Sequence, residues 1–285
     1  MGIGQPKAGI IGGTGRMGSW IGDLLEGLGI EVIKCGRSTP LRPEEVARIC
    51  DIVVISVPIK EVVNVIRQVG PLVRNDAILT DLTSMKAEPI EAMLTFSRAQ
   101  VVGLHPLFGP NAPKEGADLK VAVCPGRGKK ALDWAIETLE AAGLKSLQVS
   151  PRVHDQLMSI IQGAQHFAMI AFAMTIMGSG YALKDLAAFA TPSFVQTAER
   201  IRGILGQPSE LFGALMMDNP SSVHSIHSHT QCVEELEAIV QKRDMNSFGE
   251  LFLSLKQYFN EEETGHERNM DQGGSMGKAT GHRGP

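Results

Sequence analysis

The sequence predicts an α/β fold in two parts, a doubly wound parallel sheet followed by an all-α domain, and three observations lead to it. Over residues 1–150, short apolar runs rich in β-branched residues alternate with helical patterns, which is typical of βαβ units. Over residues 151–260, the apolar residues follow a helical period with almost no strand-like alternation. Residues 261–285 are polar and rich in glycine, so we expect a disordered tail there.

The individual elements follow from the same periodicities. Strands are expected at residues 8–11, 31–35, 51–57, 77–81, 101–104, 121–124 and 144–149. Helices are expected at residues 19–28 and 129–142 in the first half, and at 156–177, 184–205, 209–217, 222–242 and 247–259 in the second. Residues 167–177 are apolar nearly all round, which suits a helix buried against other helices or against a second subunit.

The composition argues against several classes of protein. The chain has 285 residues, a formal net charge of -4 and scattered Lys and Arg residues, so it offers no basic surface for nucleic acid. Its longest unbroken apolar stretches are shorter than the about 20 residues that span a bilayer, and its N-terminus shows no secretory signal. We therefore expect a cytoplasmic protein with neither a membrane nor a nucleic-acid partner.

The cysteines and histidines form no recognisable disulfide or metal pattern. The four cysteines include no CxxC pair, which favours reduced thiols. His224, His227 and His229 lie close together in the sequence, but no neighbouring Cys or carboxylate completes an obvious coordination set. We therefore expect no metal site, and we interpret these histidines as a solvated or interface face of a helix.

A glycine-rich loop between the first strand and the first helix predicts a Rossmann-type dinucleotide-binding domain. The segment GIIGGTGRMG carries the three glycines of the GxGxxG pattern at positions 13, 15 and 18. Gly13 permits the tight turn, Gly15 lets the backbone approach the pyrophosphate, and Gly18 lets the helix pack closely on the strand. The cofactor-binding residues expected here are Gly13, Thr14, Gly15, Arg16, Met17 and Gly18.

The end of the second strand favours NADP over NAD. An NAD site usually carries Asp or Glu there to bind the ribose 2′-hydroxyl, whereas this chain has Gly36-Arg37-Ser38. Arg37, with Ser38, is suited to a 2′-phosphate, although a solvated loop arginine is the alternative interpretation. We expect NADP, with NAD left open.

Three further motifs lie where strands of the predicted sheet end, at the carboxyl edge where ligands bind. The first ends in Ser56-Val57-Pro58, a turn that can pass under the nicotinamide end of a dinucleotide. The second, LTDLTSMK, ends with Ser84 and Lys86, and the third places His105 between Gly and Pro in GLHPLFGP. His105 could alternatively be a structural histidine at a strand end.

These motifs, followed by His154-Asp155-Gln156 and by Gln165-His166-Phe167, resemble in order and spacing the prephenate dehydrogenase family. The resemblance covers about residues 8–260. It implies a Rossmann domain followed by a dimerising helical domain, and therefore a homodimer. It also implies NAD(P)-dependent oxidative decarboxylation of prephenate to 4-hydroxyphenylpyruvate, a step of tyrosine biosynthesis.

The resemblance also implies roles for residues at the sheet edge. His105 matches the family histidine that accepts the proton of the substrate's 4-hydroxyl, and Ser84 matches a serine that orients this hydroxyl. Lys86 lies in the same motif, near the nicotinamide. His154 and Asp155 are expected to stabilise the domain junction rather than to take part in chemistry.

For the substrate carboxylates the family uses an arginine of the helical domain. Arg202 is preferred here over Arg200 because of its distance to Pro208, although a slip of one residue turns a helical side chain by about 100°. His166 matches a histidine beside the substrate's side chain, but it could equally be a core histidine. Gln162 begins a segment that departs from the family's Ser-His-Leu-Pro-His, so two polar groups of the substrate pocket are replaced.

Three alternatives remain open. Arogenate dehydrogenase uses the same ring chemistry on a substrate with an amino group in place of the keto group. An imine-type reductase usually employs a lysine on the first helix of its second domain, but residues 156–177 contain none. A catalytically silent dinucleotide sensor would need the glycine loop but would have no use for His105 and Ser84.

Overall fold

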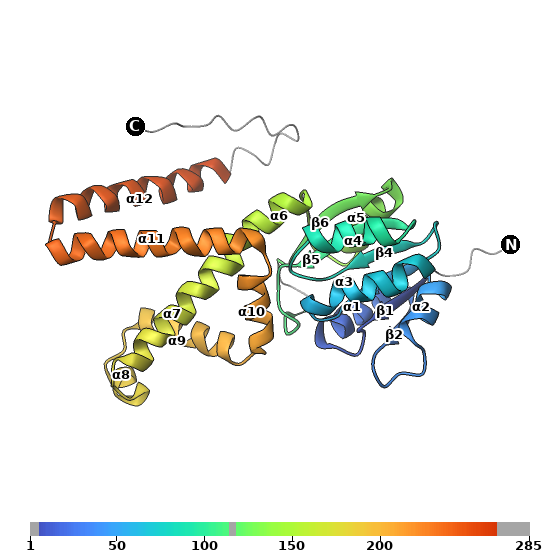
Figure 1. Cartoon of the computed structure of the whole chain (residues 1–285), viewed down its shortest axis with the longest axis horizontal. Coiled ribbons are helices and arrows are strands. Elements are labelled where there is room, and N and C mark those ends of the chain that lie inside the picture. The colour runs from blue at the N-terminus through green and yellow to red at the C-terminus, as the bar shows by residue number, and fades with distance from the viewer. Residues whose placement is uncertain (1–5, 114–117, 267–285) are drawn as a thin grey trace. The chain divides into compact units, whose positions relative to one another are not determined.

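The computed structural model describes residues 6–113 and 118–266 of the chain (Figure 1). The chain forms two compact units, Met1–His227 and Ser228–Pro285. The change of secondary structure expected near residue 150 does not separate these units, because helices that follow it pack on the sheet and its helices. Of these, α6 (Pro151–Met158) contacts α4 (Ala87–Phe96) and β6 (Lys120–Arg127), and α10 (Ser209–Met217) contacts α3 (Ile59–Val69). The sheet and the first helices after it can therefore share one site.

The first unit is built around a seven-stranded sheet in the order β2-β1-β3-β4-β5-β6-β7. Its strands are β1 (Lys7–Ile11), β2 (Glu31–Cys35), β3 (Ile52–Ile55), β4 (Ile78–Asp81), β5 (Gln100–Pro106), β6 (Lys120–Arg127) and β7 (Lys145–Gln148). All neighbouring strands are parallel except β5 and β6. The described residues between β5 and β6 contain no crossover helix, and β6 accordingly returns antiparallel. The predicted doubly wound fold is confirmed, with β6 and β7 both running opposite to the other five strands.

Helices cover both faces of the sheet and create two cores (Figure 1). Buried apolar residues of α2, α3 and α4 pack on one face, and those of α1 and α5 pack on the other. All four residues of β3 are buried, as expected for a central strand covered on both sides. These elements are α1 (Arg16–Gly27), α2 (Pro43–Ile49), α3 (Ile59–Val69), the 3₁₀ helix η1 (Gly70–Leu72), α4 (Ala87–Phe96) and α5 (Lys129–Ala141).

The chain after the sheet is helical, as predicted. It contains α6 (Pro151–Met158), the π-helix η2 (Ser159–Ala164), α7 (Gln165–Gly178), α8 (Leu183–Ala188), α9 (Pro192–Leu205), α10 (Ser209–Met217) and α11 (Pro220–Lys242). The single helix expected at residues 184–205 is divided into α8 and α9. Pro192 begins the second of these helices, and the Thr191 hydroxyl caps it by accepting from the backbone N–H of Phe194.

The helices α6, η2 and α7 join into one run of 28 residues, Pro151–Gly178, that is long and apolar enough by length and composition to cross a membrane. The expectation from the sequence considered only unbroken apolar stretches, whereas this run is interrupted by polar residues such as Asp155, Gln162 and Gln165. Length and composition alone do not distinguish a membrane span from a helix covered by protein. None of the residues of α7 is buried within the chain.

The second unit consists of the end of α11 and of α12 (Met245–His266). The helix α12 extends beyond residue 260, so the first residues of the predicted tail are helical. Glutamate is a good helix former, and three consecutive glutamates therefore do not end a helix. The rest of the predicted tail lies outside the described residues.

A buried ion pair joins the carboxyl ends of two neighbouring strands. The side chains of Lys86 and Asp81 are both fully buried, and Lys86 Nζ lies 2.5 Å from Asp81 Oδ2. Lys86 Nζ also donates to the carbonyl oxygen of Leu104 in β5, at 2.9 Å. A buried charge of this kind is stable only because its partners replace the lost water. The pair therefore fixes the end of β4 against β5.

We expect Lys86→Met to destabilise the protein by about 3–5 kcal/mol, because it leaves the Asp81 carboxylate buried without its cation. Lys129→Met is the matched control, since Lys129 forms an exposed pair with Asp133 on α5 and exposed pairs contribute little. Urea unfolding of the two variants and the parent measures both effects. Equal stability of the two variants would contradict the importance of the buried pair.

Candidate active site

The loop between β1 and α1 owes its shape to glycines. Gly12 has a positive φ of 86°, and a Cβ there would collide with the backbone of Ser56. A Cβ on Gly18 would lie 2.5 Å from the Gly12 carbonyl oxygen, so Gly18 permits the close packing expected of it. Gly12 was not singled out from the sequence, although it is the residue whose backbone most strictly requires glycine.

Gly15 differs from these glycines because the fold does not fill the space beside it. Its missing Cβ would have one neighbour within 4 Å, the Gly12 carbonyl oxygen at 3.1 Å. Gly15 is the N-cap of α1, no side chain caps this end, and the first turn carries no acidic residue. Free backbone N–H groups and the positive end of the helix dipole suit an anion such as the pyrophosphate of a dinucleotide. The residues present therefore fit such a cofactor.

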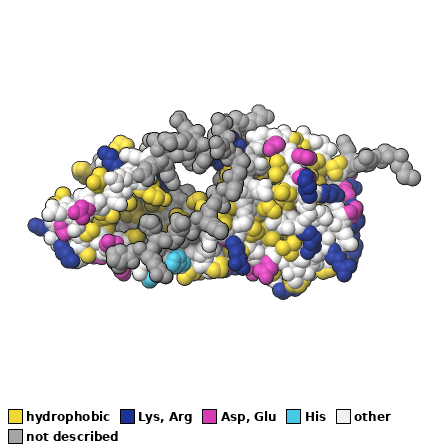
Figure 2. Space-filling view, turned by 90° about the horizontal axis from the view of Figure 1, so that it is seen from above, with side chains coloured by type: hydrophobic (Ala, Val, Ile, Leu, Met, Phe, Trp, Pro, Cys, Tyr) yellow, Lys and Arg dark blue, Asp and Glu magenta, His cyan; other side chains and the backbone are white. Residues whose placement is uncertain are grey.

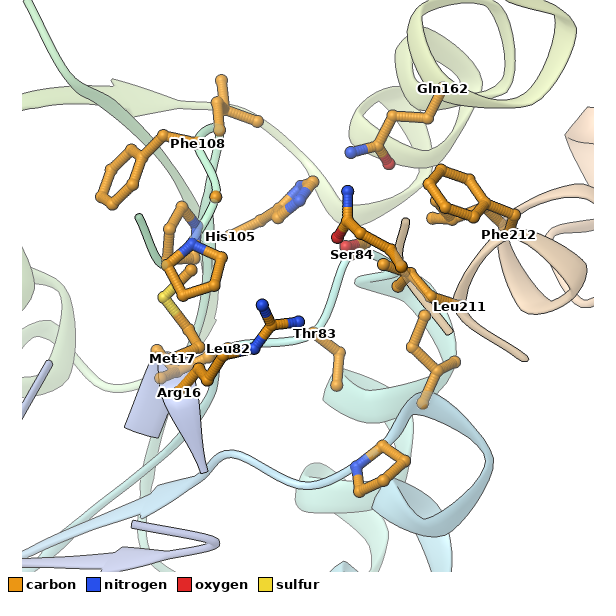
Figure 3. A pocket seen from close by; sticks show the side chains of 18 of the residues that line it. Arg16, Met17, Leu82, Thr83, Ser84, His105, Phe108, Gln162, Leu211 and Phe212 are labelled. Atoms are coloured by element: carbon orange, nitrogen blue, oxygen red, sulfur yellow. The ribbon is translucent and has the colours of Figure 1, made fainter. Parts of the chain in front are cut away.

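The loop adjoins a cavity of about 950 Å³ lined by residues from the sheet edge and from the helical segment (Figure 3). Figure 3 shows His105 and Phe108 on one side, Gln162 and Phe212 on the other, and Arg16 extending into the space between them. The structure brings together most of the residues selected from the sequence. Those on the wall are Gly15, Arg16, Met17, Gly18, Ser56, Val57, Pro58, Ser84, His105, Gln162, His166 and Arg200.

Six selected residues do not line this cavity. Arg37 and Ser38 are exposed just after β2, and Thr14 packs against Gly36 at the same strand end. Gly13 lies against the backbone of Ile10 and Lys34 and shapes the turn. These residues surround the end of β2, where the sequence predicts the 2′-substituent of the cofactor to bind. Lys86 and Arg202 are the remaining two.

Lys86 was expected near the nicotinamide, but the structure places its side chain inside the protein. Its Nζ is directed to Asp81 and to the Leu104 carbonyl, and its exposed fraction is 0%. The LTDLTSMK motif turns sharply after β4, so Ser84 faces the cavity while Lys86 faces the sheet. Lys86 therefore supports the site from behind and does not reach a ligand in the cavity.

The structure places Arg200 rather than Arg202 on the cavity wall. Arg200, Gly203 and Ile204 all line the cavity, and their spacing of three and four residues marks one face of α9, while Gln207 lines it from just after the helix. Arg202 is two positions from Arg200, and two helical residues differ by about 200° in direction. Arg202 therefore lies on another face of the helix. Arg202 was preferred from the sequence because of its distance to Pro208, but this distance does not tell in which direction the side chain points.

The π-helix η2 turns polar side chains toward the cavity. A π-turn widens the helix by one residue and is frequent at functional sites. Gln162 lies within η2, and its Oε1 is buried without a hydrogen-bond partner among the described residues. His166 follows on α7 and packs edge-on against Phe212, with the ring centroids 4.9 Å apart. An unpaired buried oxygen at this wall suits a ligand that donates a hydrogen bond.

His105 is the most buried polar side chain on the wall, with 3% of its surface exposed. Its Nδ1 lies 2.9 Å from Nε2 of His154, so Nε2 is the nitrogen left for a ligand. Burial lowers the pKa of His105 well below its ordinary value, and the positive charge of nearby Lys86 acts in the same direction. His105 is therefore a neutral imidazole near pH 7, which is the form that accepts a proton.

The charge of the wall favours anionic ligands. Among the described residues that line the cavity, Arg16 and Arg200 are cations and none is Asp or Glu. The sequence did not identify several other wall residues, namely Gln165, Gln207, Leu211, Phe212 and Leu215. The spacing of Gln207 from Arg200 could have indicated it, whereas the α10 residues gave no signal because they read as ordinary core positions.

Comparisons with known proteins agree with this arrangement. The sequence model of the prephenate dehydrogenase nucleotide-binding domain matches residues 32–148, and that of the prephenate dehydrogenase dimerization domain matches residues 150–254. The T-protein of Enterobacter agglomerans is 30% identical over 250 residues, or 88% of this chain. A probable arogenate/prephenate dehydrogenase of Methanocaldococcus jannaschii is 31% identical over 274 residues, or 89% of this chain.

This chain spans 66% and 61% of the length of these two relatives. Among solved structures, the prephenate dehydrogenase from A. aeolicus in complex with hydroxyphenyl propionate and NAD+ superposes with a TM-score of 0.74 at 17% identity. The match covers 92% of this chain and 99% of that one. It shows that the two share a fold.

Proposed function

We propose, because the chain belongs to the prephenate dehydrogenase family, that it catalyses the NAD(P)-dependent oxidative decarboxylation of prephenate to 4-hydroxyphenylpyruvate. One observation carries the proposal: a buried, neutral His105 lies on the wall of a cavity that begins at the uncapped N-terminus of α1. A proton acceptor beside a dinucleotide site is what oxidation of an alcohol requires.

The nicotinamide cofactor, when bound, supplies the acceptor for the hydride that leaves C4 of the substrate. Nε2 of His105 accepts the proton of the 4-hydroxyl, so that the C–O bond becomes a carbonyl. The bond between the ring and its carboxylate then breaks to release carbon dioxide, and its electron pair completes an aromatic phenolate, which takes the proton back from His105 to become the phenol. Ser84, on the same wall, orients the hydroxyl. Because aromatisation drives the reaction, orientation and one base suffice.

The charge of the cavity wall favours prephenate over arogenate. Both carry two carboxylates, but arogenate also carries an ammonium group that needs an acidic or carbonyl partner when it leaves water. Two arginines and no carboxylate line the described wall, so its charge opposes an ammonium group, whereas the unpaired Oε1 of Gln162 is a carbonyl oxygen that could accept from it. We therefore place prephenate first and keep arogenate as the alternative.

Arg200 is our candidate for the substrate carboxylates. It lies on the helical side of the cavity, and a guanidinium can donate two parallel hydrogen bonds to one carboxylate. For the cofactor, exposed Arg37 and Ser38 follow β2 and no acidic side chain stands at that position, which supports NADP over NAD.

We also propose a homodimer formed through the helical segment. None of the residues of α7 is buried within the chain, and its Met174 and Met177 are 62% and 80% exposed. Exposed apolar helices of this size are usually covered by a partner. The thiols of Cys35, Cys50 and Cys124, all in one of the two cores, and that of exposed Cys232 form no disulfide, which supports a cytoplasmic location. On the face shown in Figure 2, Lys and Arg are interspersed with Asp and Glu.

Reduction of the cofactor tests the proposed reaction. We expect absorbance at about 340 nm to rise with prephenate and NADP, and to rise less with arogenate or with NAD.

The Arg37→Gln variant should raise the KM for NADP about tenfold and leave that for NAD nearly unchanged, because it removes a charged hydrogen bond to the 2′-phosphate. Arg48→Gln, at an exposed position on α2, is the matched control.

A His105→Asn variant separates the enzyme from a dinucleotide sensor. The enzyme loses most of its turnover but retains cofactor affinity, which fluorescence titration of the reduced cofactor measures independently. Absence of turnover by the parent with both substrates and both cofactors would exclude the proposed reaction and leave the sensor.

The two arginines of α9 form a matched pair of variants. We expect Arg200→Gln to raise the KM for prephenate by about 10- to 100-fold, since a charge-assisted hydrogen bond contributes about 1.5–3 kcal/mol. Arg202→Gln should change KM little, because Arg202 lies off the cavity wall. The reverse result in steady-state kinetics would restore the preference that the sequence suggested.

Light scattering after gel filtration tests the dimer. We expect a mass twice that of the 30.7 kDa chain, and we expect Met174→Glu to lower it by placing a charge on the apolar face of α7. Leu147→Glu, at a 43% exposed position of β7, is the control. A monomeric parent would contradict the dimer, and a need for detergent would point to a membrane instead.

A further inference from the structure

A chain of three buried side chains leads from the cavity into the helical segment. His105 Nδ1 lies 2.9 Å from His154 Nε2, and His154 Nδ1 lies 2.7 Å from Asp155 Oδ1. The two rings meet edge to face, with centroids 5.1 Å apart. His154 has 1% of its surface exposed and Asp155 has 7%, so water does not compete for these contacts.

The protonation of Asp155 follows from its other partners. The backbone N–H of Lys86 donates to Asp155 Oδ1 at 2.8 Å, and the backbone N–H of Ala87 donates to Oδ2 at 2.9 Å. Both belong to the start of α4, where the helix dipole also favours a negative charge. Both carboxylate oxygens therefore act as acceptors, which leaves Asp155 ionised.

An ionised Asp155 determines the tautomers of both histidines. Because Asp155 can only accept, Nδ1 of His154 carries the proton and donates it to Oδ1. Nε2 of His154 then accepts from Nδ1 of His105, because a donor at both nitrogens would place a positive charge on a ring that is 1% exposed. The remaining nitrogen of His105, Nε2, keeps its lone pair.

We propose that His154 and Asp155 are positioning residues that hold His105 in the tautomer whose Nε2 accepts the substrate's proton. The proposal rests on the proposed function and deepens it. It also replaces the expectation that the two residues only stabilise the junction between the sheet and the helices. Burial keeps His105 neutral, and the chain of hydrogen bonds decides which nitrogen is free.

Two variants of His154 separate positioning from structural support. Asparagine can place an amide N–H where Nδ1 was and so keep the bond to Asp155, but it is too short to reach His105. Glutamine can place its carbonyl oxygen where Nε2 was and accept from Nδ1 of His105, but it gives up the bond to Asp155. The two variants therefore each remove a different one of the two hydrogen bonds of His154, and both retain a polar side chain of similar size.

We expect His154→Asn to lower kcat by about 10- to 100-fold with the KM for prephenate within about threefold of the parent, because His105 loses the acceptor that orients it. We expect His154→Gln to retain most of the kcat. Ser97→Ala is the control for helix stability, since the Ser97 hydroxyl bonds to the Met93 carbonyl at the opposite end of α4. Thermal unfolding of all variants accompanies the kinetics.

Side-chain ¹⁵N NMR of the free protein supplies a readout that does not need turnover. The His105 signals should report a protonated Nδ1 in the parent and in His154→Gln, and a mixture of tautomers in His154→Asn. If His154 and Asp155 only stabilise the junction between the sheet and the helices, His154→Asn should be active and His154→Gln should be destabilised. This result would overturn the proposal. A parent with the expected tautomer but no turnover would instead contradict the proposed reaction.

Discussion

The Asp155 carboxylate accepts hydrogen bonds from the backbone N–H groups of Lys86 and Ala87 and from the His154 ring, and the rest of the site depends on this. Through the first two bonds it satisfies the start of α4, and the side chain of Asn219 binds its backbone carbonyl. A buried carboxylate persists only when such donors replace water. The helical segment is therefore held in register with the sheet edge, so that residues from both can line one cavity.

Electrostatics and burial act together in that cavity. Arg16 and Arg200 line the wall and no described Asp or Glu does, which favours anions. Burial lowers the pKa of His105, so the base remains neutral in a site that attracts carboxylates. Lys86 adds to this effect from behind the wall, where its ion pair with Asp81 holds the ends of β4 and β5 together.

Different faces of the helical segment line the cavity and expose apolar side chains. Its polar side chains Gln162 and His166 face the cavity, while the apolar residues of α7 remain uncovered within one chain. Residues 150–254 match the sequence model of a dimerization domain. Dimerisation would account for this apolar surface, because a second copy would remove it from water. Apolar residues on nearly every side of α7 therefore suit an interface with a second copy.

The sequence by itself determined the order of strands and helices, the glycine loop and the motifs at the strand ends, because periodicity and glycine chemistry are local. It also located His105, Ser84 and the helix that carries the arginines. Only the tertiary structure decided that Arg200 faces the cavity, that Lys86 points into the sheet, and that His154 reaches His105. Side-chain direction changes by about 100° per helical residue and shifts again at a π-turn, so these outcomes depend on how the elements pack.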